Sequence, residues 1–89
     1  MDYQAIIHAL VDSIVEHPES ILVRVLPNEN SDKDVTILIV TEKDDTARLI
    51  GRKGVIANAL REVVGIAGKS ENKHVHLKFE SFEDEKVGA

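Results

Sequence analysis

The sequence contains no cysteine and no tryptophan, and aromatic residues make up only 3% of it. Without cysteine the chain can form no disulfide, no thiolate zinc site and no cysteine nucleophile. It also has no apolar run near the roughly 18 residues that a membrane-spanning helix needs. Asp2 does not suit a signal peptide, which begins with positive charge. These absences predict a cytoplasmic protein without a membrane span.

The residues that are present fit one globular domain. Apolar residues make up 43% of the chain and charged residues 30%, a balance typical of a folded protein rather than a disordered one. A chain of 89 residues is long enough for one small core. We expect a single domain over 1–80 and an acidic, frayed tail over 81–89.

Apolar spacing predicts the order helix, strand, strand, helix, helix, strand. Residues 3–15 have apolar side chains at helical spacing, and Pro18 is expected to end that helix. Residues 20–26 and 34–41 are predicted strands around a polar turn at 27–33, and residues 74–80 form a third strand. A helical crossover normally joins parallel strands. The expected fold is α+β, a two-layer sandwich with a three-stranded mixed sheet and the helices on one face.

The pattern leaves more apolar surface than one small core needs. Residual packing and a partner surface are both open explanations. A small domain gains stability by burying such a surface against a second copy, so we expect a homodimer, with the second central helix as the favoured contact. The apolar residues concerned are Leu22, Leu26, Leu38 and Val40 on the sheet, and Val55, Ile56, Ala59 and Val63 on that helix. The full apolar stripe predicted for the helix also includes Leu60, Val64 and Ala67.

The most informative stretch is the turn Gly51-Arg52-Lys53-Gly54 between the two central helices. Gly51 can end the first helix in a left-handed conformation, and Gly54 opens the second, where the positive end of the helix dipole lies. From Ala47 to Arg61 there are four cations and no acid, although the whole chain has a net charge of −5. This concentration of positive charge predicts an anionic ligand, and phosphate in particular. The alternative is an ordinary solvated surface.

The run from Leu49 to Ile56 resembles the Ile-Gly-x-x-Gly-x-x-Ile signature of KH domains. From Tyr3 to Phe79 the chain resembles the small bacterial KhpA family, whose members are type II KH domains. Val55 stands where that family usually has a further basic residue, and Ala47 where it often has glycine. The resemblance implies that about four nucleotides of single-stranded RNA are clamped at the loop.

The resemblance also implies a groove between the two central helices on one side and the second strand with the 28–34 loop on the other. Ile37 or Ile39 would then form an apolar wall for the bases. The predicted RNA-binding residues are Arg48, Ile50, Gly51, Arg52, Lys53, Gly54, Val55, Asn58 and Arg61.

For the family's role, the resemblance implies an RNA chaperone or post-transcriptional regulator. Its partners would be a second copy of the chain and a second KH-containing protein (KhpB, also called Jag or EloR), with effects on cell shape and envelope growth. The alternative is a protein-dimerisation module with a vestigial loop. We expect no enzymatic activity and no cofactor. We also expect no metal site, because His74 and His76 have no evident third ligand.

Overall fold

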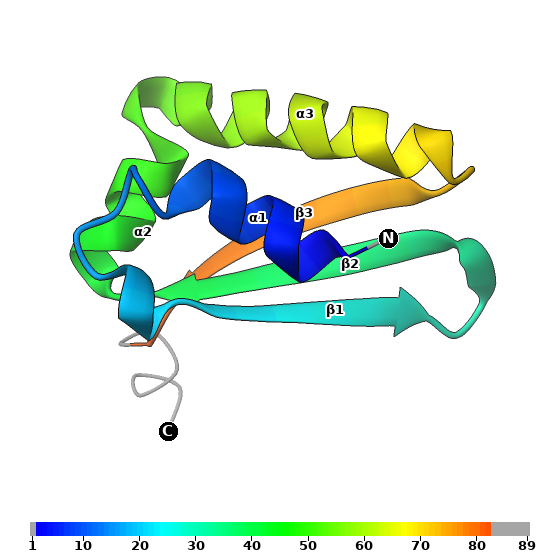
Figure 1. The fold of residues 1–89 in the computed structure, drawn as a ribbon, viewed down its shortest axis with the longest axis horizontal. Helices are drawn as coiled ribbons and strands as arrows, with labels where there is room; N and C mark the ends of the chain where they lie inside the picture. Colours follow the sequence, from blue (N-terminus) through cyan, green and yellow to red (C-terminus); the bar gives the residue numbers. More distant parts are fainter. Residues whose placement is uncertain (1, 83–89) are drawn as a thin grey trace.

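The computed structural model describes residues 2–82, and its elements follow the predicted order. Strand β2 lies between β1 and β3, antiparallel to β1 and parallel to β3, and Figure 1 shows the helices on one face of this sheet. The predicted α+β sandwich is therefore confirmed. The helices are α1 (Tyr3–Val11), α2 (Lys43–Ile50) and α3 (Val55–Ser70), and the strands are β1 (Leu22–Asn28), β2 (Ser31–Thr41) and β3 (His74–Ser81).

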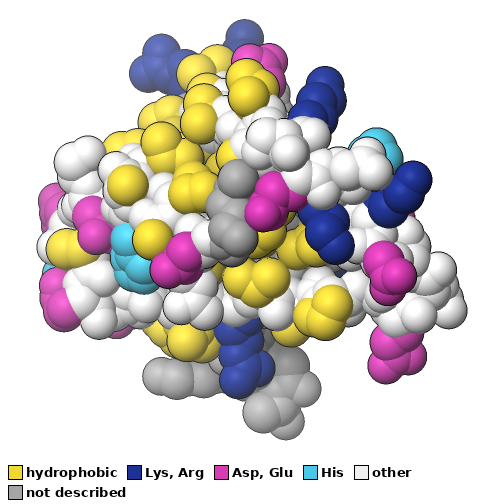
Figure 2. Space-filling model, turned by 45° about the vertical axis from the view of Figure 1, so that its right-hand side comes forward, with side chains coloured by type: hydrophobic (Ala, Val, Ile, Leu, Met, Phe, Trp, Pro, Cys, Tyr) yellow, Lys and Arg dark blue, Asp and Glu magenta, His cyan; other side chains and the backbone are white. Residues whose placement is uncertain are grey.

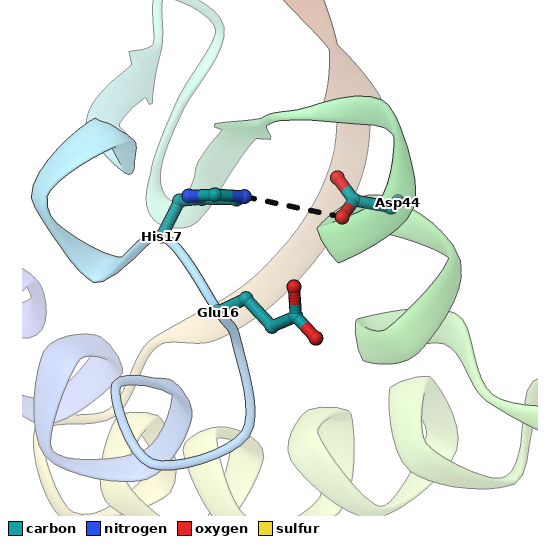
Figure 3. Close-up of side chains that lie close together, drawn as sticks. All are labelled: Glu16, His17 and Asp44. Atoms are coloured by element: carbon teal, nitrogen blue, oxygen red, sulfur yellow. Dashed lines mark ion pairs between the residues drawn. The ribbon is translucent and has the colours of Figure 1, made fainter.

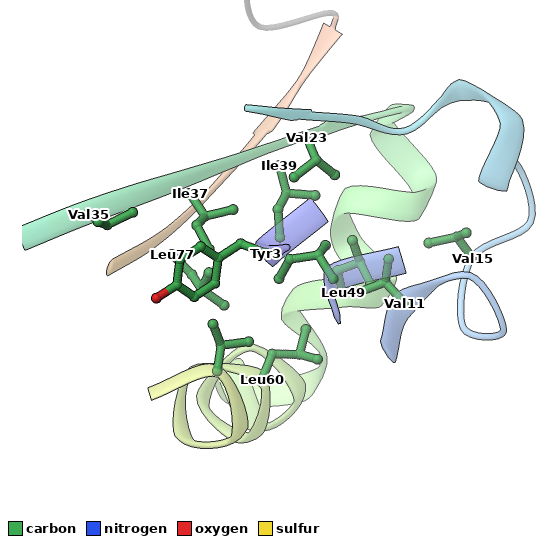
Figure 4. Close-up of a cluster of buried hydrophobic side chains, with 12 residues drawn as sticks. Tyr3, Val11, Val15, Val23, Val35, Ile37, Ile39, Leu49, Leu60 and Leu77 are labelled. Atoms are coloured by element: carbon green, nitrogen blue, oxygen red, sulfur yellow. The ribbon is translucent and has the colours of Figure 1, made fainter. Parts of the chain in front are cut away.

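The core lies between the helices and the inner face of the sheet (Figure 4). Ile37 and Ile39 of β2 are at its centre and are completely buried. They therefore cannot form the wall of an open groove, and that prediction was wrong. Other members of the core are Tyr3, Ile7, Val11, Val15, Val23, Val35, Leu49, Leu60, Val64 and Leu77.

Helix α1 ends at Val11, well before Pro18. The physical reason lies in the segment that follows it. The backbone N–H groups of Glu16 and His17 donate to the two carboxylate oxygens of Asp45 in α2, each at 2.9 Å, instead of to helical carbonyls. A buried side chain from a distant element thus competes with the helix and ends it early.

The hairpin between β1 and β2 is tighter than the seven-residue polar turn that was predicted. Pairing continues to Asn28 and Ser31, so that only Glu29 and Asn30 lie between the strands. The side-chain oxygen of Asn28 accepts a hydrogen bond of 2.7 Å from the backbone of Asn30 and closes the turn. The paired strands therefore extend further toward the turn than the alternation of apolar and polar residues predicted.

Helix α3 buries a narrower stripe than predicted. Ala57, Leu60, Val64 and Gly68 face the core, whereas the predicted members Val55, Ala59 and Val63 are exposed. Ile66 is 70% exposed. Figure 2 shows hydrophobic side chains gathered over the upper part of the molecule, where α3 lies in Figure 1. The helix thus leaves apolar side chains on its outer surface.

On the outer face of the sheet, Leu22 and Leu26 are exposed as expected, but Val40 is buried. The predicted acidic tail starts one residue too early, because Ser81 still belongs to β3; residues 83–89 lie outside the described part of the chain. Within residues 2–82, none of the helices has the length and apolar character that a membrane crossing requires.

Candidate nucleic-acid interface

The turn between α2 and α3 has an unusual backbone. Gly51 has φ 75° and ψ 175°, and Gly54 has φ 78° and ψ 14°. Lys53, which has a side chain, also has a positive φ of 56°. Positive φ values disfavour residues with a Cβ, so the turn depends on its glycines and holds Lys53 under mild strain. The N–H of Gly54 donates to the carbonyl of Gly51 at 3.1 Å and closes the turn.

The two glycines are needed for different reasons. A Cβ at Gly51 would lie 2.8 Å from Cγ1 of Ile56, so both its backbone angle and the lack of space exclude a side chain. A Cβ at Gly54 would meet nothing nearer than Nδ2 of Asn58 at 3.9 Å, so only the backbone angle matters there. The space above Gly54 therefore stays open to a ligand.

Arg52 and Lys53 extend from this turn into solvent. Neither forms an ion pair or hydrogen bond with any residue of the described chain. No described side chain caps the N-terminus of α3, a helix of 16 residues, so its positive dipole end also faces the turn. Two free cations and an uncapped helix end together favour an anion such as phosphate.

Arg48 was predicted to belong to this set, but the structure places it among carboxylates. Its guanidinium lies 2.9 Å from Glu16, 3.1 Å from Asp44 and 2.9 Å from Asp45. Burial would raise the pKa of Asp45, but the two backbone N–H donors and Arg48 outweigh it and hold that pKa below its ordinary value. Arg48 thus joins α2 to the segment after α1, and its charge is already balanced.

Glu16, His17 and Asp44 lie close together at this cluster, and Figure 3 shows the His17 ring directed at the Asp44 carboxylate. One ligand atom from each lies within 4.8 Å of the others, a spacing that could hold a metal ion. Arg48 already contacts both carboxylates, however, so that a metal ion would have to displace its guanidinium.

The histidines of β3 are placed differently. His76 pairs through Nε2 with the Asp34 carboxylate at 3.1 Å, across the parallel β2–β3 pair. The hydrogen bond from His76 is the main cause that lowers the pKa of Asp34. The pair of His76 and Asp34 therefore links β3 to β2.

Asn58 and Arg61 lie on α3 beyond the turn, and both are exposed. Arg61 donates to the side-chain oxygen of Asn58 at 3.3 Å and to the backbone carbonyl of Leu77 at 3.4 Å. Its guanidinium carbon also lies 5.6 Å from the centre of the Phe79 ring. This contact could not be predicted from local spacing, because Phe79 is 18 positions away from Arg61 and reaches it only through the fold.

The groove implied by the family resemblance needs a second correction. Helices α2 and α3 both pack against β3, and α2 also contacts β2. The β1–β2 turn and the glycine turn lie at opposite ends of the molecule in Figure 1, so the 28–34 segment cannot face the glycine turn. The apolar residues that do flank the turn are Ile50, 39% exposed, and Val55, 66% exposed.

The comparisons with known proteins point to one family. Residues 4–79 match the model of the family described as "KhpA/KhpB, KH domain". The chain is 36% identical over 78 residues to the "RNA-binding protein KhpA" of Bacillus subtilis, which covers 88% of this chain and 89% of the relative. It is 32% identical over 75 residues to the protein of the same name from Listeria monocytogenes, covering 84% and 95%. No solved structure gives a significant match.

Proposed function

The chain belongs to the KhpA/KhpB family of KH domains, and from this premise we propose that it binds single-stranded RNA at the Gly51–Gly54 turn. The proposal rests on Arg52 and Lys53, which have no ion-pair or hydrogen-bond partner among residues 2–82 and lie on a turn that Gly54 leaves open. Phosphates meet these cations and the N-terminus of α3. The bases lie against Ile50 and Val55, the exposed apolar side chains beside the turn.

A single strand fits this site better than a duplex. The apolar side chains can contact a base only when it is unstacked and turned toward the protein, as KH domains require. The turn is short and offers few charges, so one domain should bind with modest affinity. A second copy of the domain would raise the overall affinity by avidity.

The test is the double substitution Arg52→Asp with Lys53→Asp, measured by fluorescence anisotropy on a labelled single-stranded RNA. Both side chains are exposed, so each substitution should change the free energy of unfolding by no more than about 0.5 kcal/mol. The matched control is Arg24→Asp with Lys33→Asp, the same charge change at exposed positions in β1 and β2. We expect loss of binding only in the first protein; equal affinity of both variants and the wild type would refute the site.

We also propose a homodimer, formed through the outer surface of α3. Val55, Ala59, Val63 and Ile66 recur at helical spacing there and are all exposed. A small domain gains stability when such a surface is covered, and two-fold pairing is the commonest way. Val55 adjoins the glycine turn, so this interface and RNA binding can influence each other.

The wider role follows the family. The relatives reported above are named RNA-binding proteins, and neither name is that of an enzyme, so we propose a binding role without catalysis. We propose that the protein acts in the cytoplasm as an RNA chaperone or post-transcriptional regulator, in complex with a second KH-containing protein, and influences cell shape and cell-wall growth. If the turn were vestigial and the domain only a dimerisation module, RNA binding would be absent while the dimer persisted.

A further inference from the structure

A shallow hollow of about 390 Å³ lies on α3, two helical turns beyond the glycine turn. Its volume falls in the lower part of the range of ligand pockets, roughly 300–1,000 Å³. Gly65 creates it, because a Cβ placed there would meet no atom within 4 Å. The hollow is lined by Arg61, Glu62, Gly65, Ile66 and Lys69.

Arg61 forms one wall of this hollow and is held in place from the other side. Asn58 and the Leu77 carbonyl accept its hydrogen bonds, and the Phe79 ring lies within cation–π distance at 5.6 Å. The residue as a whole is still exposed, so part of the guanidinium stays open to a ligand. A planar guanidinium fixed in this way is a surface on which a nucleobase can stack.

The hollow is connected to the glycine turn by a short polar path. Asn58 lies beside Gly54, and its side-chain oxygen contacts Arg61. The seven residues from Gly54 to Arg61 correspond to about 10 Å along the helix. In one strand of a stacked duplex the charges follow one another at about 3.4 Å along the axis, and an extended single strand covers the same distance with fewer nucleotides. A strand held at the turn therefore reaches the hollow with a nearby nucleotide.

We infer that the hollow beside Gly65 holds one nucleobase of the bound RNA, stacked on Arg61. The inference rests on the proposed function and adds a base-binding position to it. Lys69 meets a phosphate of that nucleotide. The Glu62 carboxylate can only accept hydrogen bonds, so the base that fits presents N–H groups. Guanine, with adjacent donors on N1 and N2, suits this position better than uracil.

The decisive variants are Gly65→Leu and its matched control Gly65→Ala. Gly65 lies inside α3 with free space around it, so neither side chain should harm the fold, and alanine favours a helix over glycine. Leucine fills the hollow, whereas alanine leaves most of it open. Affinity is measured on an eight-nucleotide RNA of adenines and on a series in which each base in turn is replaced by an abasic site.

In the wild type and in Gly65→Ala, one abasic position should weaken binding by roughly 5- to 150-fold, the range that loss of one stacked base produces. In Gly65→Leu, binding of the intact RNA should already be weakened to that extent, and removal of the same base should have little further effect. Guanine at that position should bind more tightly than uracil, and Glu62→Ala should reduce the difference.

Other outcomes overturn the inference in distinguishable ways. If Gly65→Leu binds as the wild type does while the Arg52→Asp, Lys53→Asp protein does not bind, the hollow holds no base but the proposed function stands. If Gly65→Leu instead loses its dimer in sedimentation and its affinity equals that of a monomeric variant, the hollow belongs to the dimer contact. If the wild type does not bind the RNA at all, both proposals fail.

Discussion

Substitution by alanine should change the stability of the protein differently at three of its glycines. Gly51→Ala places a methyl group 2.8 Å from Ile56 at φ 75° and ψ 175°, a backbone region that only glycine readily adopts. The backbone cost is about 1–3 kcal/mol and the overpacking adds about 1–3 kcal/mol. We therefore expect a loss of about 2–6 kcal/mol in the free energy of unfolding.

Gly54→Ala meets no close atom, and only its left-handed backbone matters, so the loss should be about 1–2 kcal/mol. Gly65→Ala, inside α3, should gain about 1 kcal/mol. The order of stability should therefore be Gly65→Ala, wild type, Gly54→Ala and then Gly51→Ala.

The assay is urea denaturation followed by circular dichroism, with all proteins at one concentration because a dimer makes stability depend on concentration. Each kcal/mol corresponds to about 4–8 °C in the melting temperature of a domain of this size, so Gly51→Ala should melt roughly 10–50 °C below the wild type. If Gly51→Ala were as stable as Gly54→Ala, the close contact with Ile56 would not be limiting, and the account of the turn would be wrong.

Two further predictions concern the rest of the domain. Asp45→Asn should cost about 2–4 kcal/mol in urea denaturation, because an amide cannot accept from both backbone N–H groups and cannot balance Arg48. In the folded protein the pKa of Asp45 lies below its ordinary value of 3.8. The stabilisation that Asp45 contributes should therefore be fully present above pH 3.8 and be lost as the pH falls below it. The loss of stability in acid should be smaller in Asp45→Asn. In sedimentation, Ala59→Glu should dissociate the dimer while Leu38→Glu leaves it intact; a wild-type monomer at high micromolar concentration would contradict the dimer, and loss only with Leu38→Glu would move the interface to the sheet.

The order of helices and strands could be predicted because the spacing of apolar residues, and the residues that end a helix or strand, are local properties of the sequence. Alternating apolar residues gave the strands, and the crossover between the second and third strands gave their parallel pairing. Boundaries failed where a distant group decided them. The early end of α1 depends on Asp45, which lies about thirty positions away in the sequence. A helical wheel likewise cannot tell that only Ala57, Leu60, Val64 and Gly68 of α3 find a core to face.

The candidate site was predictable to a similar degree. Two glycines around two cations at a helix start are a local signal, and the structure places these residues at an open turn with strained backbone. Counting charges along the chain overstated the free positive charge, because the partners of Arg48 include Glu16, which lies 32 positions before it. The contact between Arg61 and Phe79 depends on tertiary packing and left no local trace.

Phosphate binding at the glycine turn is tested most directly by the salt dependence of RNA binding. The cations available to phosphate are Arg52 and Lys53 at the turn and Lys69 beside the hollow, because Arg48 is paired and Arg61 stacks on a base. Three neutralised phosphates predict that log affinity for a single strand falls against log salt with a slope of about −2, and that Arg52→Ala with Lys53→Ala reduces it to about −0.7. A duplex of the same sequence should bind more weakly. A wild-type affinity that does not change with salt, or a slope that the double substitution leaves unaltered, would contradict phosphate binding at the glycine turn.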